Sequence, residues 1–214
     1  MFALLGHHFE AGGWAMWLIL FWLVCTLGLI TERLLYLLGA HQDPDAFTAT
    51  VLKGIASRDF YQSIAISKSA RTPLGRIVQA GLGQAMQPPK KMQAAMDEAA
   101  LREMPKLTRN MNLLTFFANL AMLSGLFGTI VGLIKAFGAV GGPSIDPSAK
   151  ARILAEGIAE AMNCTAFGLL SAIVALVGYA VINGWIQNIE DSIHLETVRV
   201  YNAIKQARRE YPHP

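Results

Sequence analysis

The sequence is poor in charged residues and leaves three long tracts without any. Asp, Glu, Lys and Arg make up 15% of the 214 residues, and none of them occurs in residues 11–31, 110–134 or 161–189. Each tract is long enough to cross a hydrocarbon core of about 30 Å, which takes about 20 helical residues. With a hydrophobic content of 53%, this excludes a soluble domain built on one core and predicts three transmembrane helices.

Cysteine is also scarce, and the histidines are scattered. Cys25 and Cys164 lie far apart in two apolar tracts, so they form neither a disulfide framework nor a metal-ligand spacing. The basic residues are not interleaved with exposed aromatic residues in a soluble module, which excludes nucleic-acid binding. We therefore predict that the chain is not an enzyme and that it binds no metal or cofactor.

The distribution of Lys and Arg predicts the orientation in the membrane. None precedes Glu32, ten of the 18 lie in residues 39–110, and the turn GGPSIDPSAK holds only Lys150. Short loops rich in Lys and Arg stay in the cytoplasm. We expect a multi-pass protein of the bacterial inner membrane, with the amino terminus and that turn in the periplasm and the carboxyl terminus in the cytoplasm.

The predicted fold class is an all-α membrane protein with long helices that extend into the cytoplasm. Beyond the third tract, Ile189, Ile193, Val200 and Ile204 keep one apolar face, so the helix continues. The second span grows from the helix before it, with a kink at Pro105. The predicted segments are a periplasmic amino terminus (1–13), transmembrane helix 1 (14–38), a cytoplasmic helical segment (39–109), transmembrane helix 2 (110–140), a periplasmic turn (141–150), transmembrane helix 3 (151–187) and a cytoplasmic helical tail (188–214).

Small residues form a stripe in the second span. Ser124, Gly128 and Gly132 recur at four-residue spacing, which places them on one helix face and lets another helix approach closely. Such stripes are common in membrane helices, so the glycines can serve tight packing without any further function.

Polar residues in the second and third spans are the candidates for function. Thr129 and Thr165 lie at comparable depths, although each hydroxyl can simply bond the backbone carbonyl one turn back. Glu156, Glu160 and Asn163 follow one face at the outer end of span three, and intramembrane polar groups are functional candidates because they are costly. Glu160 is the best of the three, since Glu156 can lie at the wet boundary and Asn163 can join helices. No Asp or Glu lies near the middle of a span, so a partner must supply the acid if protons cross.

Two motifs carry a resemblance to a known family. GLFGTIVGLIKAF (125–137) and GIAEAMNCTAFGLLSAIVALVGY (157–179) resemble the paired signature of the MotA/TolQ/ExbB proton channel family. The ERLLYLL ending of span one (32–38) and the three-span layout resemble its ExbB/TolQ branch rather than the four-span MotA branch. Asn163, Cys164 and Lys135 depart from the usual residues of that branch.

The resemblance implies a subunit that builds the channel of a motor driven by the proton motive force. Five copies would surround the single span of an ExbD/TolR-like partner that carries an intramembrane aspartate. The output would be mechanical work on the cell envelope: energised import, Tol-type maintenance or gliding motility. The matching positions imply a proton pathway of Thr129, Thr165, Glu160, Ser124 and Asn163, and a helix-packing role for Gly125, Gly128, Gly132, Gly157 and Gly168.

Two other functions remain open on the sequence. A structural membrane scaffold without ion conduction would also use a glycine stripe and long cytoplasmic helices. A self-sufficient solute transporter is disfavoured, because no span is broken by proline and no inverted repeat is present.

Overall fold

The structure is a computed structural model that describes residues 13–40, 44–57, 59–70, 72–141 and 146–209. Within these ranges every regular element is a helix and no strand occurs. Three helices, α2 (Trp14–Ala40), α7 (Met111–Val140) and α8 (Pro147–Arg209), are long and apolar enough to cross a membrane. The predicted all-α membrane fold with three long apolar helices is confirmed.

The chain forms two compact units. The first unit comprises Met1–Glu32 and Asn110–Val181, and the second comprises Arg33–Arg109 and Ile182–Pro214. Helices α2 and α8 contribute residues to both, so each unit contains part of a long apolar helix.

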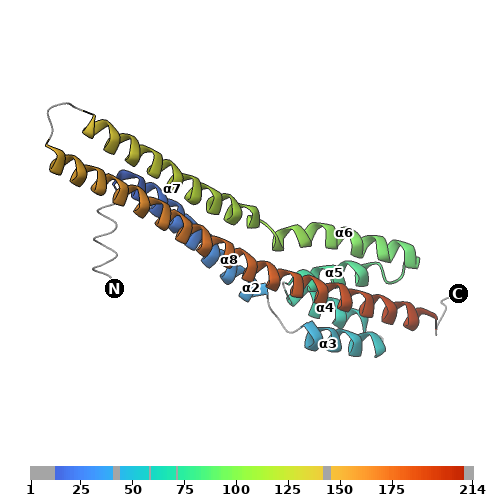
Figure 1. The fold of residues 1–214 in the computed structure, drawn as a ribbon. Coiled ribbons are helices and arrows are strands. Elements are labelled where there is room, and N and C mark those ends of the chain that lie inside the picture. Colours follow the sequence, from blue (N-terminus) through green and yellow to red (C-terminus); the bar gives the residue numbers. More distant parts are fainter. Residues whose placement is uncertain (1–12, 41–43, 58, 71, 142–145, 210–214) are drawn as a thin grey trace. The chain divides into compact units, whose positions relative to one another are not determined.

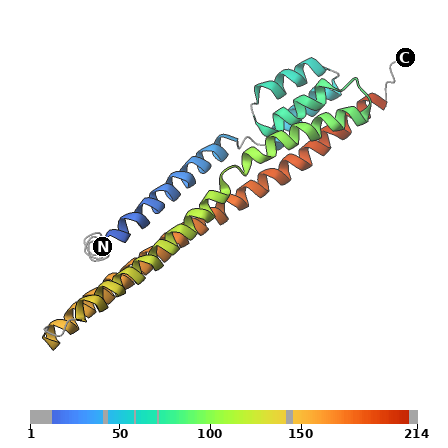
Figure 2. The ribbon, with the colours of Figure 1, turned by 90° about the horizontal axis from the view of Figure 1, so that it is seen from above.

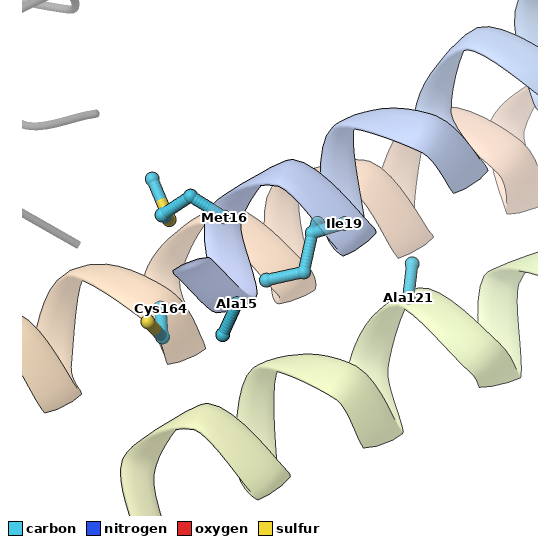
Figure 3. Packing of buried hydrophobic residues seen from close by; sticks show 5 residues of the cluster. All are labelled: Ala15, Met16, Ile19, Ala121 and Cys164. Atoms are coloured by element: carbon cyan, nitrogen blue, oxygen red, sulfur yellow. The ribbon is translucent and has the colours of Figure 1, made fainter. Parts of the chain in front are cut away.

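In the first unit, small side chains let three helices approach one another. Figures 1 and 2 show α7 beside the first part of α8, with the two helices running in opposite directions. Figure 3 shows where the start of α2 meets them: Ala15, Met16 and Ile19 of α2 are buried with Ala121 of α7 and Cys164 of α8. Large apolar side chains such as Phe116, Phe127 and Ile173 face outward, as expected for surfaces that meet lipid or other membrane helices.

The second unit contains four shorter helices beside the later part of α8. These are α3 (Pro44–Ala56), α4 (Phe60–Ser69), α5 (Pro73–Gly83) and α6 (Pro89–Leu107). Asp59 and Thr72 are the N-caps of α4 and α5, because their side chains accept hydrogen bonds from the backbone N–H of Gln62 (2.8 Å) and Gly75 (3.2 Å). Of the apolar face that the sequence predicts on α8, Ile193, Val200 and Ile204 are buried, and Ile189 is half-buried.

Two buried carboxylates connect the helices of this unit. Glu103 of α6 is 6% exposed and accepts hydrogen bonds from Arg76 of α5 and from Lys106 (2.6 Å). Glu196 of α8 is 2% exposed and pairs with Arg199 at 2.7 Å, and Arg199 also contacts Asp45 of α3 at 3.2 Å. Because a buried carboxylate is costly when it is not paired, these ion pairs restrict how the helices can pack.

The interruption before α7 lies at a different residue from the one that the sequence predicts. The chain stays helical through Pro105, α6 ends at Leu107, and α7 begins only at Met111. Asn110 adopts a left-handed conformation with φ of 62°, which asparagine tolerates better than most residues. Near this break, Arg33 of α2 donates a hydrogen bond to the carbonyl of Lys106 (3.5 Å), one of the carbonyls that a helix end leaves without an internal partner.

Candidate functional site

Glycines bring the backbones of α7 and α8 into direct contact. A Cβ atom placed on Gly125 would lie 2.9 Å from the carbonyl oxygen of Cys164 and 3.2 Å from the Cα of Gly168. A Cβ atom on Gly168 would lie 2.8 Å from the carbonyl oxygen of Ala121. Since these neighbours are backbone atoms, a side chain at either position requires the helices to move apart.

The other three glycines of the predicted packing set also lie in this contact. A Cβ atom on Gly128 would lie 2.9 Å from the Cβ of Ala15, so α2 also approaches at this level. On Gly132 it would lie 3.3 Å from the Cβ of Ala161, and on Gly157 it would lie 3.3 Å from the Cα of Ala136. Close approach therefore continues over several turns of α7 and α8.

Thr129 and Thr165 meet within this close contact. Their hydroxyl groups are hydrogen-bonded to each other, and the Thr129 hydroxyl also reaches the carbonyls of Gly125 (3.0 Å) and Ala161 (3.2 Å). A carbonyl only accepts, and a hydroxyl has a single proton to donate. The two threonines, both half-buried, can thus exchange donor and acceptor roles without any movement of the backbone.

Ser124 lies apart from the threonine pair. Its hydroxyl accepts a hydrogen bond from the indole N–H of Trp22 (3.2 Å), and the Trp22 ring stacks on Phe117 with 5.7 Å between centroids. The structure thus places Trp22 of α2 against α7. The spacing of Ala15, Ile19 and Trp22 on one face of α2 is the signal that could have shown this.

The acidic and amide residues at the outer end of α8 do not join the pair. Among the described residues no hydrogen bond connects Glu160 or Asn163 to Thr129 or Thr165, and both residues are half-buried. Glu160 approaches the start of α2, where a Cβ atom on Gly13 would lie 3.2 Å from its carboxyl carbon. Glu156 is exposed and forms an ion pair with Arg152 at 3.5 Å.

The site can therefore order hydrogen bonds, but it has no group of its own that takes up a proton at neutral pH. Threonine hydroxyls both donate and accept, and they can align water or a carboxylate that approaches from another chain. Within the described ranges, no cluster of three His, Cys, Asp or Glu side chains has the geometry of a metal site.

Comparison with known proteins gives consistent matches. The family model described as the MotA/TolQ/ExbB proton channel family matches residues 69–194. An ExbB-like biopolymer transport protein (ExbB-like 1) of Synechocystis sp. is 34% identical over 128 residues, which is 59% of this chain and 50% of that protein. The Tol-Pal system protein TolQ of Haemophilus influenzae is 39% identical over 85 residues (40% and 36%), and the biopolymer transport protein exbB1 of Vibrio cholerae is 39% identical over 77 residues (35% and 32%). The match thus spans half or less of the length of these relatives.

Proposed function

Because the chain belongs to the MotA/TolQ/ExbB proton channel family, we propose that it is the channel-forming, stator-type subunit of a motor driven by the proton motive force. The family is one of membrane proteins that energise transport, and this chain belongs to its ExbB/TolQ-like branch. The observation that supports the proposal most directly is the hydroxyl pair of Thr129 and Thr165 in the contact between two apolar helices.

The proposed mechanism requires a second protein. No carboxylate lies in the middle of an apolar tract of this chain, so the proton carrier would be the intramembrane aspartate of a single-span, ExbD/TolR-like partner. The ionised aspartate would accept hydrogen bonds from the hydroxyls of Thr129 and Thr165 or from water that they order. Protonation would weaken this interaction and let the partner step relative to the channel wall, which converts proton flow into motion.

The proposed assembly is a ring of five copies around the partner's span, in the bacterial inner membrane. The amino terminus and residues 141–150 would face the periplasm, while residues 39–109 and 188–214 would lie in the cytoplasm, since Lys and Arg gather there. Glu160, Asn163 and Ser124 would add polar groups along the path. The work done on the envelope would be energised import, Tol-type maintenance or gliding motility; two relatives carry names from biopolymer transport and the Tol-Pal system.

Replacing both hydroxyls by methyl groups tests the proposal. The variant Thr129→Val with Thr165→Val keeps nearly the same volume, so we expect the assembly to remain intact and proton-dependent function to be lost. The complex is extracted gently from its native membrane, its mass gives the copy number and the partner, and proton uptake is followed after reconstitution into vesicles. Thr31→Val is the matched control, since the Thr31 hydroxyl is exposed and donates to the carbonyl of Leu27 in its own helix (2.8 Å).

Each outcome has a definite meaning. Full proton uptake by the double variant would refute the assignment of the path to these two hydroxyls. A complex that holds no single-span partner, even when it is crosslinked before extraction, and that moves no protons would refute the motor and favour a structural scaffold.

A further inference from the structure

The second unit contains a cavity of about 320 Å³ that the proposed proton path does not use. It is enclosed by the end of α2, the starts of α3 and α5, and the stretch of α8 from Trp185 to Ile193. Its volume lies within the range of about 300–1,000 Å³ that is usual for small-molecule sites. Every lining residue belongs to the second unit.

The wall of the cavity is mostly apolar. Leu37, Leu74 and Ile193 are 1%, 4% and 3% exposed and form its inner side. The hydroxyl of Ser192 donates to the backbone carbonyl of Asn188 (2.8 Å), and that of Thr72 accepts from the N–H of Gly75 (3.2 Å). The Ser192 hydroxyl is thus engaged as a donor and the Thr72 hydroxyl as an acceptor, and the buried side chains of Leu37, Leu74 and Ile193 make the interior suit a hydrocarbon chain better than water.

The mouth of the cavity faces the level at which the apolar helices end. Leu38 (59% exposed) and Trp185 (44% exposed) belong to the lining, and they lie at or near the ends of the predicted transmembrane helices 1 (14–38) and 3 (151–187). Tryptophan is enriched where the bilayer meets water. Leu35 and Leu38 continue the exposed apolar surface of α2 up to the mouth, so in the proposed membrane placement the cavity opens towards lipid.

We propose that this cavity binds an acyl chain of a phospholipid from the cytoplasmic leaflet, with the exposed carboxamide of Asn188 at the mouth beside the lipid's polar part. This inference rests on the membrane placement in the proposed function. Bound lipid fills the space between α2, α3, α5 and α8 and thereby supports the helices that leave the membrane.

Photolabelling of the full chain tests the proposal. The protein is reconstituted into vesicles of phosphatidylethanolamine and phosphatidylglycerol that contain a trace of phosphatidylcholine with a diazirine in one acyl chain. After illumination, labelled peptides are identified by mass spectrometry. We expect label on peptides that contain Leu37, Leu74 or Ile189, in addition to label on the outward faces of the apolar helices.

Two variants fill the cavity and one serves as the matched control. Ser192→Phe and Asn188→Phe place an aromatic ring in the lining, and we expect both to lose label on the lining peptides. Leu195→Phe lies three residues further along the same helix at an exposed position outside the lining and should keep it. Label on residues 111–140 shows that each variant is still inserted in the membrane.

The outcomes separate this inference from the proposed function. Label on the apolar helices with none on the lining of the wild-type protein would overturn the lipid site and leave the membrane placement intact. A crosslink to a second copy of the chain from a photoreactive amino acid placed at Asn188 would also overturn it, because the cavity would then be part of a subunit interface. Absence of label from residues 111–140 would overturn the membrane placement itself.

Discussion

Replacing Gly168 by alanine should destabilise the contact between α7 and α8. The added Cβ atom would lie 2.8 Å from the carbonyl oxygen of Ala121 and 3.0 Å from the Cα of Gly125. Carbon atoms pack best at about 3.5 Å or more. To relieve the contact with the Cα of Gly125, the two helices must therefore move apart by roughly 0.5 Å. Backbone atoms cannot rotate away as a side chain can, so the shift falls on the whole helix pair.

The expected loss of stability is estimated by comparing Gly168→Ala with Gly138→Ala. Overpacking a tight interior costs about 1–3 kcal/mol, whereas alanine in place of glycine favours a helix by about 1 kcal/mol. Among the described residues, Gly138 on α7 has no atom outside its own stretch of helix within 4 Å of an added Cβ, so Gly138→Ala should show only the gain in helix propensity. We therefore expect Gly168→Ala to be less stable than Gly138→Ala by about 1–3 kcal/mol.

Unfolding in mixed detergent micelles with increasing dodecyl sulfate measures this difference, because the four tryptophans report on the transition. Gly125→Ala is a second variant at the same contact, and its added Cβ would lie 2.9 Å from the carbonyl oxygen of Cys164. Equal stability of all three variants, within about 0.5 kcal/mol, would refute the close backbone approach on which the site depends.

Three further changes have definite expected results. Glu103→Ala removes a carboxylate that is 6% exposed and should lower the melting temperature measured by circular dichroism, whereas Glu98→Ala removes an exposed i,i+4 pair and should leave it nearly unchanged. Asn110→Gly should leave the melting temperature nearly unchanged, because glycine adopts the left-handed conformation freely. Asn110→Val should lower the free energy of unfolding by about 1–2 kcal/mol and should therefore lower the melting temperature. Trp22→Phe removes the indole donor to Ser124 and should shift the hydroxyl's infrared or hydrogen-exchange signal while the α7–α8 contact stays intact.

The apolar helices could be predicted because one property, the absence of charge over some 20 or more residues, is sufficient to require them in a bilayer. The break before α7 could not be placed. Proline is the stronger helix breaker, but Pro105 lies in the last turn of α6, where its missing N–H affects only the carbonyl of Leu101. Asn110 interrupts the chain instead, because a left-handed residue there ends one helix and begins another.

The sequence identifies Thr129 and Thr165 as candidate residues, but it does not predict which candidate residues contact each other. Counting from the turn places Thr129 and Thr165 at similar depths, yet their contact depends on how far each helix is rotated about its axis, which tertiary packing decides. The family resemblance groups Glu160 with the pair, whereas the structure turns it towards Gly13. The cavity in the second unit could not be foreseen, because its walls come from four helices whose relative placement is decided by tertiary packing.

The glycine contact and the threonine contact form one arrangement. Thr129 reaches the carbonyl of Gly125, and the missing side chain of that same residue lets the Cys164 carbonyl approach α7. Thr129 also reaches the carbonyl of Ala161, which stands opposite Gly132. A larger residue at Gly125 would push the two helices apart at the Cys164 carbonyl and would lengthen the hydrogen bonds of Thr129 with Ala161 and Thr165. A packing stripe and a polar site are therefore not competing interpretations of these residues, because here the hydroxyls meet only where the glycines let the two backbones touch.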